Sequence, residues 1–177
     1  GLCFPTTSFI RRSGISELDV RLGDEACMVG RHRNFDGGRT NTPTARFGHV
    51  VQFPGEAVKD DRGRELSAFF VQTPSLPGFS GSPVFLTQDQ SEKDAERGVI
   101  AMSPTGNRSI VLLGVNSGHL PAYSPTYTSN TNQVNPYITA ETNSGIIKVV
   151  PAWHLDELIT RFLLLRGSIP SIHSRTL

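Results

Sequence analysis

The hydrophobic positions of this chain form short runs, each bounded by glycine, proline or charged residues, which is the pattern of β-strands. The runs that predict strands lie at 26–30, 45–53, 66–73, 84–86, 110–115 and 145–150. Within 45–53, Phe47, Val51 and Phe53 alternate with polar residues, so we expect that face to be buried, with His49 on the same side.

A helical period occurs near the C-terminus. Pro151 suits the first position of a helix, and apolar residues then recur every three or four positions. These residues are Leu155, Leu158, Ile159, Phe162 and Leu165. They predict one amphipathic helix over 152–165, with Trp153 packed under it. Many strands followed by one helix predict an all-β protein, an antiparallel barrel or sandwich with a C-terminal helix.

The segment 121–144 has a different composition from the rest of the chain. It is rich in Ser, Thr, Asn and Pro, has no Lys or Arg, and contains all three tyrosines. It predicts a long surface loop. Such a loop is either a passive insertion or a rim over a binding cleft, with Tyr123, Tyr127 and Tyr137 as contacts.

Charge and length narrow the classes of protein. The 177 residues suit one domain, and the net charge of +1 gives no general attraction to nucleic acid or anionic membranes. No apolar run is long enough to cross a membrane. Cys3 and Cys27 are too few for a disulfide framework and match no zinc pattern, so reduced, buried thiols are expected, with one disulfide as the alternative. No metal or cofactor is expected.

The sequence Gly-Phe-Ser-Gly-Ser-Pro-Val at 78–84 carries the clearest chemistry. Glycines at 78 and 81 allow a tight turn around Ser80, and an apolar strand follows Pro83. A serine hydroxyl among free backbone N–H groups offers a nucleophile and an oxyanion site in one loop. The Gly-x-Ser-x-Gly elbow of α/β-hydrolases does not fit, because the fifth position is Ser82 and a strand follows instead of a helix.

This loop resembles the nucleophile loop of the trypsin-like serine peptidases of the chymotrypsin fold. Segments 22–25, 28–30, 42–48, 113–117 and 143–152 resemble, in the same order, parts of the second barrel of bacterial members. The resemblance implies a Greek-key barrel with a terminal helix over 20–167, preceded by a connector at 1–19 and followed by a tail at 168–177. It also implies that Ser80 attacks a peptide carbonyl and that the N–H groups of Gly78 and Ser80 hold the oxyanion.

The resemblance further implies that Asn116, Ser117 and Gly118 present backbone to an extended peptide substrate. No acidic residue stands near Pro74 and Ser75, where the specificity pocket is expected, so a small or apolar preference is expected over Lys or Arg.

The chain departs from the family where the catalytic base should be. The family order is His, Asp, Ser, with the first two in the first barrel. Only 79 residues precede Ser80, and His32 and His49 fall in segments that match the second barrel. Phe79 also replaces the polar or acidic residue that usually precedes the serine. We therefore expect the Ser-bearing half of a serine endopeptidase, whose partners are a peptide substrate and the N-terminal half of the protease.

Two other hypotheses stay open. A catalytically inactive barrel could bind peptides by strand addition, and a purely structural β-domain is the third possibility, although it leaves the Ser80 loop unexplained. The compartment is not indicated by the sequence.

Overall fold

The fold is taken from a computed structural model, which describes residues 5–31, 42–55, 58–59, 63, 65–74, 78–89, 108–127 and 133–167. The described residues do not include Cys3, His32, Ser75 or the tail at 168–177.

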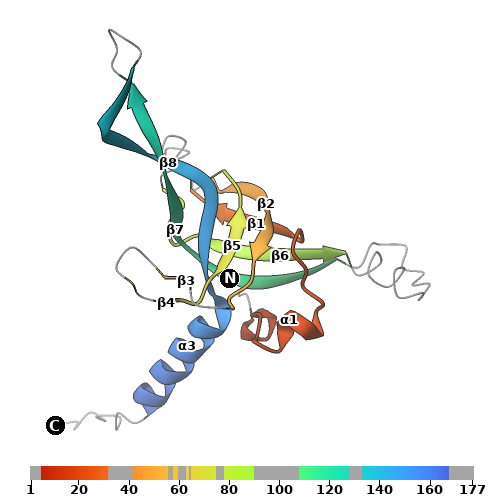
Figure 1. Ribbon diagram of the computed structural model, residues 1–177. Helices are drawn as coiled ribbons and strands as arrows, with labels where there is room; N and C mark the ends of the chain where they lie inside the picture. The colour runs from red at the N-terminus through yellow and green to blue at the C-terminus, as the bar shows by residue number, and fades with distance from the viewer. Residues whose placement is uncertain are drawn as a thin grey trace, which may run out of the picture.

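Six antiparallel strands close into a barrel in the order β1-β2-β5-β8-β7-β6 (Figure 1). The strands are β1 (Glu25–Gly30), β2 (Thr44–Gln52), β5 (Phe69–Gln72), β6 (Pro83–Asp89), β7 (Arg108–Tyr127) and β8 (Val134–Pro151). A separate two-stranded sheet pairs β3 (Val58–Lys59) with β4 (Glu65–Leu66). The predicted all-β barrel with a C-terminal helix is thus confirmed at the level of architecture.

The barrel core is made largely by alternate residues of these strands, while β5 has three consecutive buried residues, Phe69 to Val71. Fully buried side chains include Met28, Val50, Val71, Leu113 and Ile147. They form one cluster with the other inward residues, which is the period-2 pattern of strands with one face buried.

The buried face of β2 is the opposite of the one predicted. Gly48 and Val50 face the core, whereas Phe47 is 60% exposed and His49 is also exposed. A Cβ at Gly48 would collide with the backbone carbonyl of Gln72 on the neighbouring strand. The close approach of β2 and β5 therefore requires glycine at this inward position, and glycine gives no hydrophobic signal in the sequence.

The N-terminal segment packs against the barrel through two short helices, η1 (Thr6–Ser8) and α1 (Gly14–Glu17). Between them, Phe9 forms a parallel bridge with Leu112, and the Ile10 N–H donates to the Leu112 carbonyl at 3.0 Å. Ile10 is buried in the main core.

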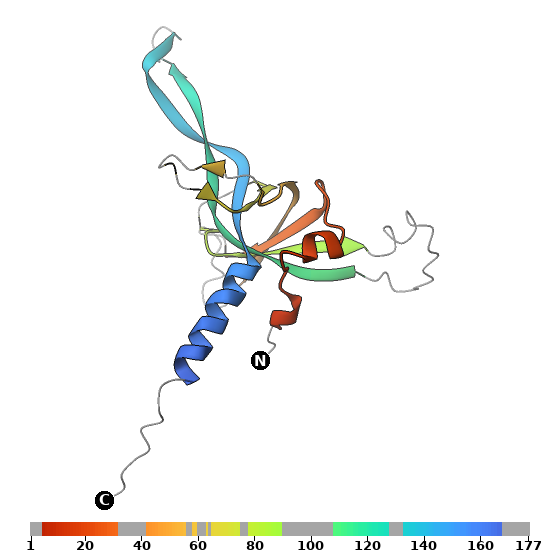
Figure 2. The same cartoon turned by 60° about the horizontal axis from the view of Figure 1, so that its bottom comes forward.

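The segment expected to be a surface loop is largely a β-hairpin. Beyond the barrel, β7 and β8 continue to pair from Pro121 and Asn143 as far as Tyr127 and Val134, and both views show them projecting as an arm (Figures 1 and 2). Hydroxyl groups reinforce the pairing: Ser144 Oγ donates to the Leu120 carbonyl at 2.6 Å. The loop prediction was therefore wrong for the described part of 121–144.

The predicted helix is present as α3 (Ala152–Gly167). Its first turn is held by the barrel: Ala152 and Trp153 are buried, and the indole lies 5.7 Å from the Phe69 ring. The rest of α3 leaves the barrel, as Figure 2 shows, and its large apolar side chains are exposed. These are Leu158, Ile159, Phe162, Leu163, Leu164 and Leu165. In the part of the chain described, no helix is sufficiently long and apolar to span a membrane.

Candidate functional site

Ser80 lies at the tip of a tight turn that leads into β6. Gly78 has φ +103° and Gly81 has φ +85°, values that side-chain-bearing residues rarely adopt. The two glycines therefore permit the turn, as the sequence predicted, and Ser80 between them is exposed to solvent.

Phe79 anchors this turn to the barrel. Its side chain has no exposed surface, and its ring lies against Gly30, where a Cβ would come within 2.7 Å of Cδ1. The Arg46 guanidinium stacks over the same ring at 5.0 Å, and Nη1 reaches the Pro74 carbonyl at 3.5 Å. The residue before Ser80 is thus held by packing of its apolar ring. The trypsin-like peptidases that the loop resembles usually have a polar or acidic residue at this position.

Asn116 on β7 holds the turn through hydrogen bonds of its side chain and its backbone. Its side-chain Nδ2 donates to the Phe79 carbonyl at 2.9 Å and contacts Met28 Sδ at 3.4 Å. Its carbonyl accepts from the Gly81 N–H at 2.8 Å, and its N–H donates to the Ser82 carbonyl at 2.9 Å. Asn116 is 2% exposed, and both of its backbone groups are already engaged by the turn.

Ser117 and Gly118 follow at a β-bulge. Asn116 pairs with Val149 and Gly118 with Lys148, so Ser117 is the additional residue of β7. Ser117 is exposed, with its Oγ on the Lys148 carbonyl at 3.2 Å, and the Gly118 N–H donates to Asn116 Oδ1 at 2.9 Å. Of the three residues expected to line a substrate strand, these two are the ones near the surface.

Two N–H groups of the turn make no hydrogen bond to any described residue. Among the described residues, no hydrogen bond uses the N–H of Gly78, the N–H of Ser80 or the Ser80 hydroxyl. An oxyanion hole requires donors that are not already satisfied by the protein, and Gly78 and Ser80 meet that requirement.

The described histidines bond elsewhere or face solvent. His119 Nε2 lies 3.5 Å from Glu141 Oε1 at the base of the arm, and His154 Nδ1 lies 3.2 Å from Glu157 Oε2 on α3. His49 lies on the outer face of β2. Within the described part of the chain, no histidine is hydrogen-bonded to Ser80.

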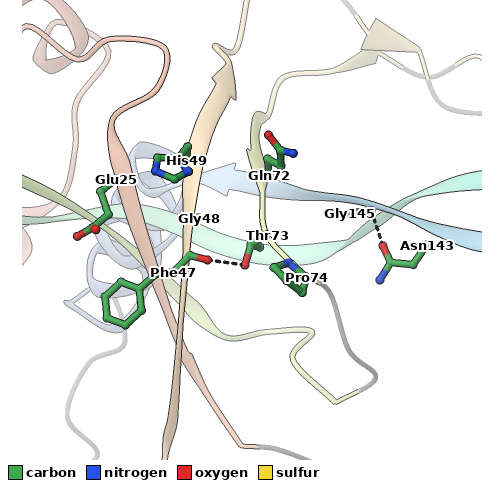
Figure 3. Close-up of a pocket in the computed structure, with 9 residues that line it drawn as sticks. All are labelled: Glu25, Phe47, Gly48, His49, Gln72, Thr73, Pro74, Asn143 and Gly145. Atoms are coloured by element: carbon green, nitrogen blue, oxygen red, sulfur yellow. Dashed lines mark hydrogen bonds between the residues drawn. The ribbon is translucent and has the colours of Figure 1, made fainter.

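A separate hollow of about 690 Å³ lies beside the middle of β2 and the C-terminal end of β5 (Figure 3). Its lining residues are Glu25, Phe47, Gly48, His49, Gln72, Thr73, Pro74, Asn143 and Gly145. The Thr73 hydroxyl donates to the Phe47 carbonyl at 3.0 Å across it. Neither Ser80 nor residues 116–118 line this hollow, so it is distinct from the Ser80 turn.

Other chemistry is limited within the described residues. They contain no group of three or more metal-ligating side chains. Cys27 is a free cysteine, and burial, with a smaller contribution from the negative charge of Glu25, raises the pKa of its thiol. A raised pKa keeps the thiol protonated and makes it a poor nucleophile.

The roles of Phe79, Arg46 and Asn116 were missed by sequence reasoning, which assigned Asn116 to substrate binding. Of these three residues, only Phe79 gives a signal in the sequence. A large apolar side chain in a glycine-rich turn is expected to be buried. Comparison of the chain with models of known families, with curated proteins and with solved structures found no match.

Proposed function

We propose that the protein is a serine endopeptidase in which Ser80 is the nucleophile. The observation that carries this proposal is the turn itself: an exposed Ser80 with its own N–H and that of Gly78 unengaged among the described residues. Two N–H donors beside a nucleophilic hydroxyl are what acyl transfer requires.

The strand order supports a relationship to the second barrel of the chymotrypsin fold. Strands β6, β7 and β8 are neighbours in sequence and in space. Strand β5 pairs with β8, and β6 pairs with β1, which closes the barrel. On this proposal, the return of β5 to the side of β8 is a Greek-key connection. The Ser80 turn lies between β5 and β6 in this order.

In the proposed reaction, Ser80 Oγ attacks the carbonyl carbon of a peptide bond while a general base takes its proton. The negative oxygen of the tetrahedral intermediate accepts hydrogen bonds from the two N–H groups. The C–N bond then breaks, the amine leaves with the proton, and water hydrolyses the resulting ester to release the acid and restore the Ser80 hydroxyl.

The general base of this proposal lies outside the described residues. A serine hydroxyl is a weak nucleophile without a base, so activity depends on a histidine and an aspartate supplied by a further segment. An N-terminal half of the protease is the partner that the resemblance implies. The sequence on either side of Pro74 contains no acidic residue, which supports a peptide substrate with a small or apolar residue before the cleaved bond.

The second candidate function is a catalytically inactive barrel that binds extended peptides. It is favoured by one observation, that the Ser80 hydroxyl has no hydrogen bond to a histidine among the described residues. In that case the surface around Ser117 and Gly118 would bind peptide without cleaving it.

Hydrolysis separates the two functions. The longest natural chain that contains this sequence should cleave acylated peptides with Ala or Val before the scissile bond. Ser80→Ala should lower kcat by about 10⁴- to 10⁶-fold. Ser82→Ala is the matched control, since it removes a hydroxyl two residues away, and it should change kcat by less than about threefold. Peptide binding without cleavage by the unmodified chain would favour the inactive barrel.

A further inference from the structure

Asn116 contacts the Ser80 turn at three points on both sides of Ser80. Its Nδ2, carbonyl and N–H bind the Phe79 carbonyl, the Gly81 N–H and the Ser82 carbonyl at 2.9, 2.8 and 2.9 Å. Because the residue is almost fully buried, these bonds are made away from competing water.

The direction of the Phe79 carbonyl fixes the direction of the next N–H. This carbonyl accepts from Asn116 Nδ2 and from the Ser82 N–H, the latter at 3.1 Å. No peptide bond among the described residues is cis. In a trans peptide the C=O and the following N–H point in opposite directions. The Ser80 N–H therefore points away from the buried Asn116 side chain.

We infer that Asn116 is a positioning residue, which orients the Phe79–Ser80 peptide so that the Ser80 N–H is available to the oxyanion. This inference rests on the proposed function, in which that N–H stabilises the intermediate. Asn116 itself touches neither the substrate nor the reacting atoms.

The same side chain joins the turn to the strand edge expected to meet the substrate. Asn116 Oδ1 accepts the Gly118 N–H at 2.9 Å while Nδ2 donates to the Phe79 carbonyl. One amide thereby fixes the oxyanion donor and the bulge at Ser117 relative to each other. This double role requires a donor and an acceptor in one neutral side chain, which an amide provides.

Asn116→Asp tests the donor alone, because aspartate keeps the acceptor for Gly118. In the longest natural chain, kcat should fall by about 10²- to 10³-fold, the usual effect of losing one oxyanion donor. KM should change by less than about threefold, since ground-state binding is untouched.

The pH dependence distinguishes positioning from a general structural defect. The groups in contact with the Asn116 side chain are the Met28 sulfur, the Phe79 carbonyl and the Gly118 N–H, all uncharged. Burial favours the protonated form of an aspartate placed there, and a protonated carboxyl can again donate to Phe79. The ratio of variant to wild-type kcat should therefore rise as the pH falls.

Asn143→Asp is the matched control. Asn143 Oδ1 accepts the Gly145 N–H at 2.9 Å, the same local bond two residues along the chain, but Asn143 is exposed. Its kcat should stay within about threefold of the wild type. An unchanged kcat in Asn116→Asp, or an equal loss in both variants, would overturn the inference.

Amide hydrogen exchange tests the same orientation without catalysis. The Ser80 N–H should exchange at least about tenfold faster than the bonded N–H groups of Gly81 and Ser82. Protection of Ser80 equal to that of Gly81 would refute the inference even if peptides are cleaved. If peptides are not cleaved but Ser80 exchanges fast, the proposed function fails while the orientation of the peptide stands.

Discussion

At the scale of single residues, the conformation of the Ser80 turn is held by its neighbours Phe79, Asn116 and Gly30. Phe79 is fully buried in the core, Asn116 binds three residues of the turn, and Gly30 leaves room for both Phe79 and Ser82. A rigid supporting shell of this kind is what holds a nucleophile and its oxyanion donors in place before substrate arrives.

Gly30→Ala, at the end of β1, should disturb this turn. The added Cβ would collide with Ser82 Oγ and lie 2.7 Å from the Phe79 ring, and the ring has no free space in which to move. We expect a loss of about 1–3 kcal/mol in the free energy of unfolding, together with weaker reactivity of Ser80. Chemical denaturation measures the first effect, and the rate of phosphonylation measures the second.

The control for Gly30→Ala is Gly55→Ala. The nearest atom to a Cβ at Gly55 is the Phe53 carbonyl oxygen, at 3.9 Å, which is an ordinary contact. Equal stability and reactivity in the two variants would show that the Gly30 contact does not support the turn.

At the scale of elements, the sequence predicted where strands lie better than which way they face. Apolar runs bounded by turn residues located β1, β6 and α3, because burial of alternating or periodic side chains leaves a pattern in the sequence. In β2 the inward positions include Arg46 and Gly48, which carry no such pattern.

Two further features were beyond what the sequence could show. The arm strands mix polar residues with exposed apolar ones such as Tyr123 and Ile138, so no buried face marks them in the sequence. Backbone pairing and hydroxyl bonds from residues such as Thr142 hold them together. The bond from Asn116 to Phe79 joins residues 37 positions apart, and no local rule relates such positions. The tight turn around Ser80 was predictable from its two glycines, whereas the contacts of Phe79 and Asn116 that hold it were not.

The exposed part of α3 should add nothing to the stability of this chain. Leu158 and Leu165 are both 63% exposed, so Leu158→Ser and Leu165→Ser should change the free energy of unfolding by less than about 0.5 kcal/mol. Trp153→Ala should cost about 3–5 kcal/mol, because the indole is 7% exposed and packs on Phe69. Thermal unfolding compares the three variants, and a loss in Leu158→Ser as large as that in Trp153→Ala would contradict this description of α3.

At the scale of the whole molecule, a closed barrel carries two extensions, the β7–β8 arm and α3 (Figures 1 and 2). The barrel supplies the Ser80 turn, while α3 exposes a contiguous set of large apolar side chains. Large apolar side chains exposed together on one helix are typical of an interaction site.

The most direct test of the central claim is covalent labelling of Ser80. The longest natural chain containing this sequence is treated with a peptide phosphonate that has Ala or Val at the reacting position, and the modified residue is located by peptide mass spectrometry. We predict one phosphonyl adduct, on Ser80, that disappears in Ser80→Ala and persists in Ser82→Ala. An unlabelled Ser80 under conditions that label a known serine peptidase would contradict the claim that Ser80 is a nucleophile.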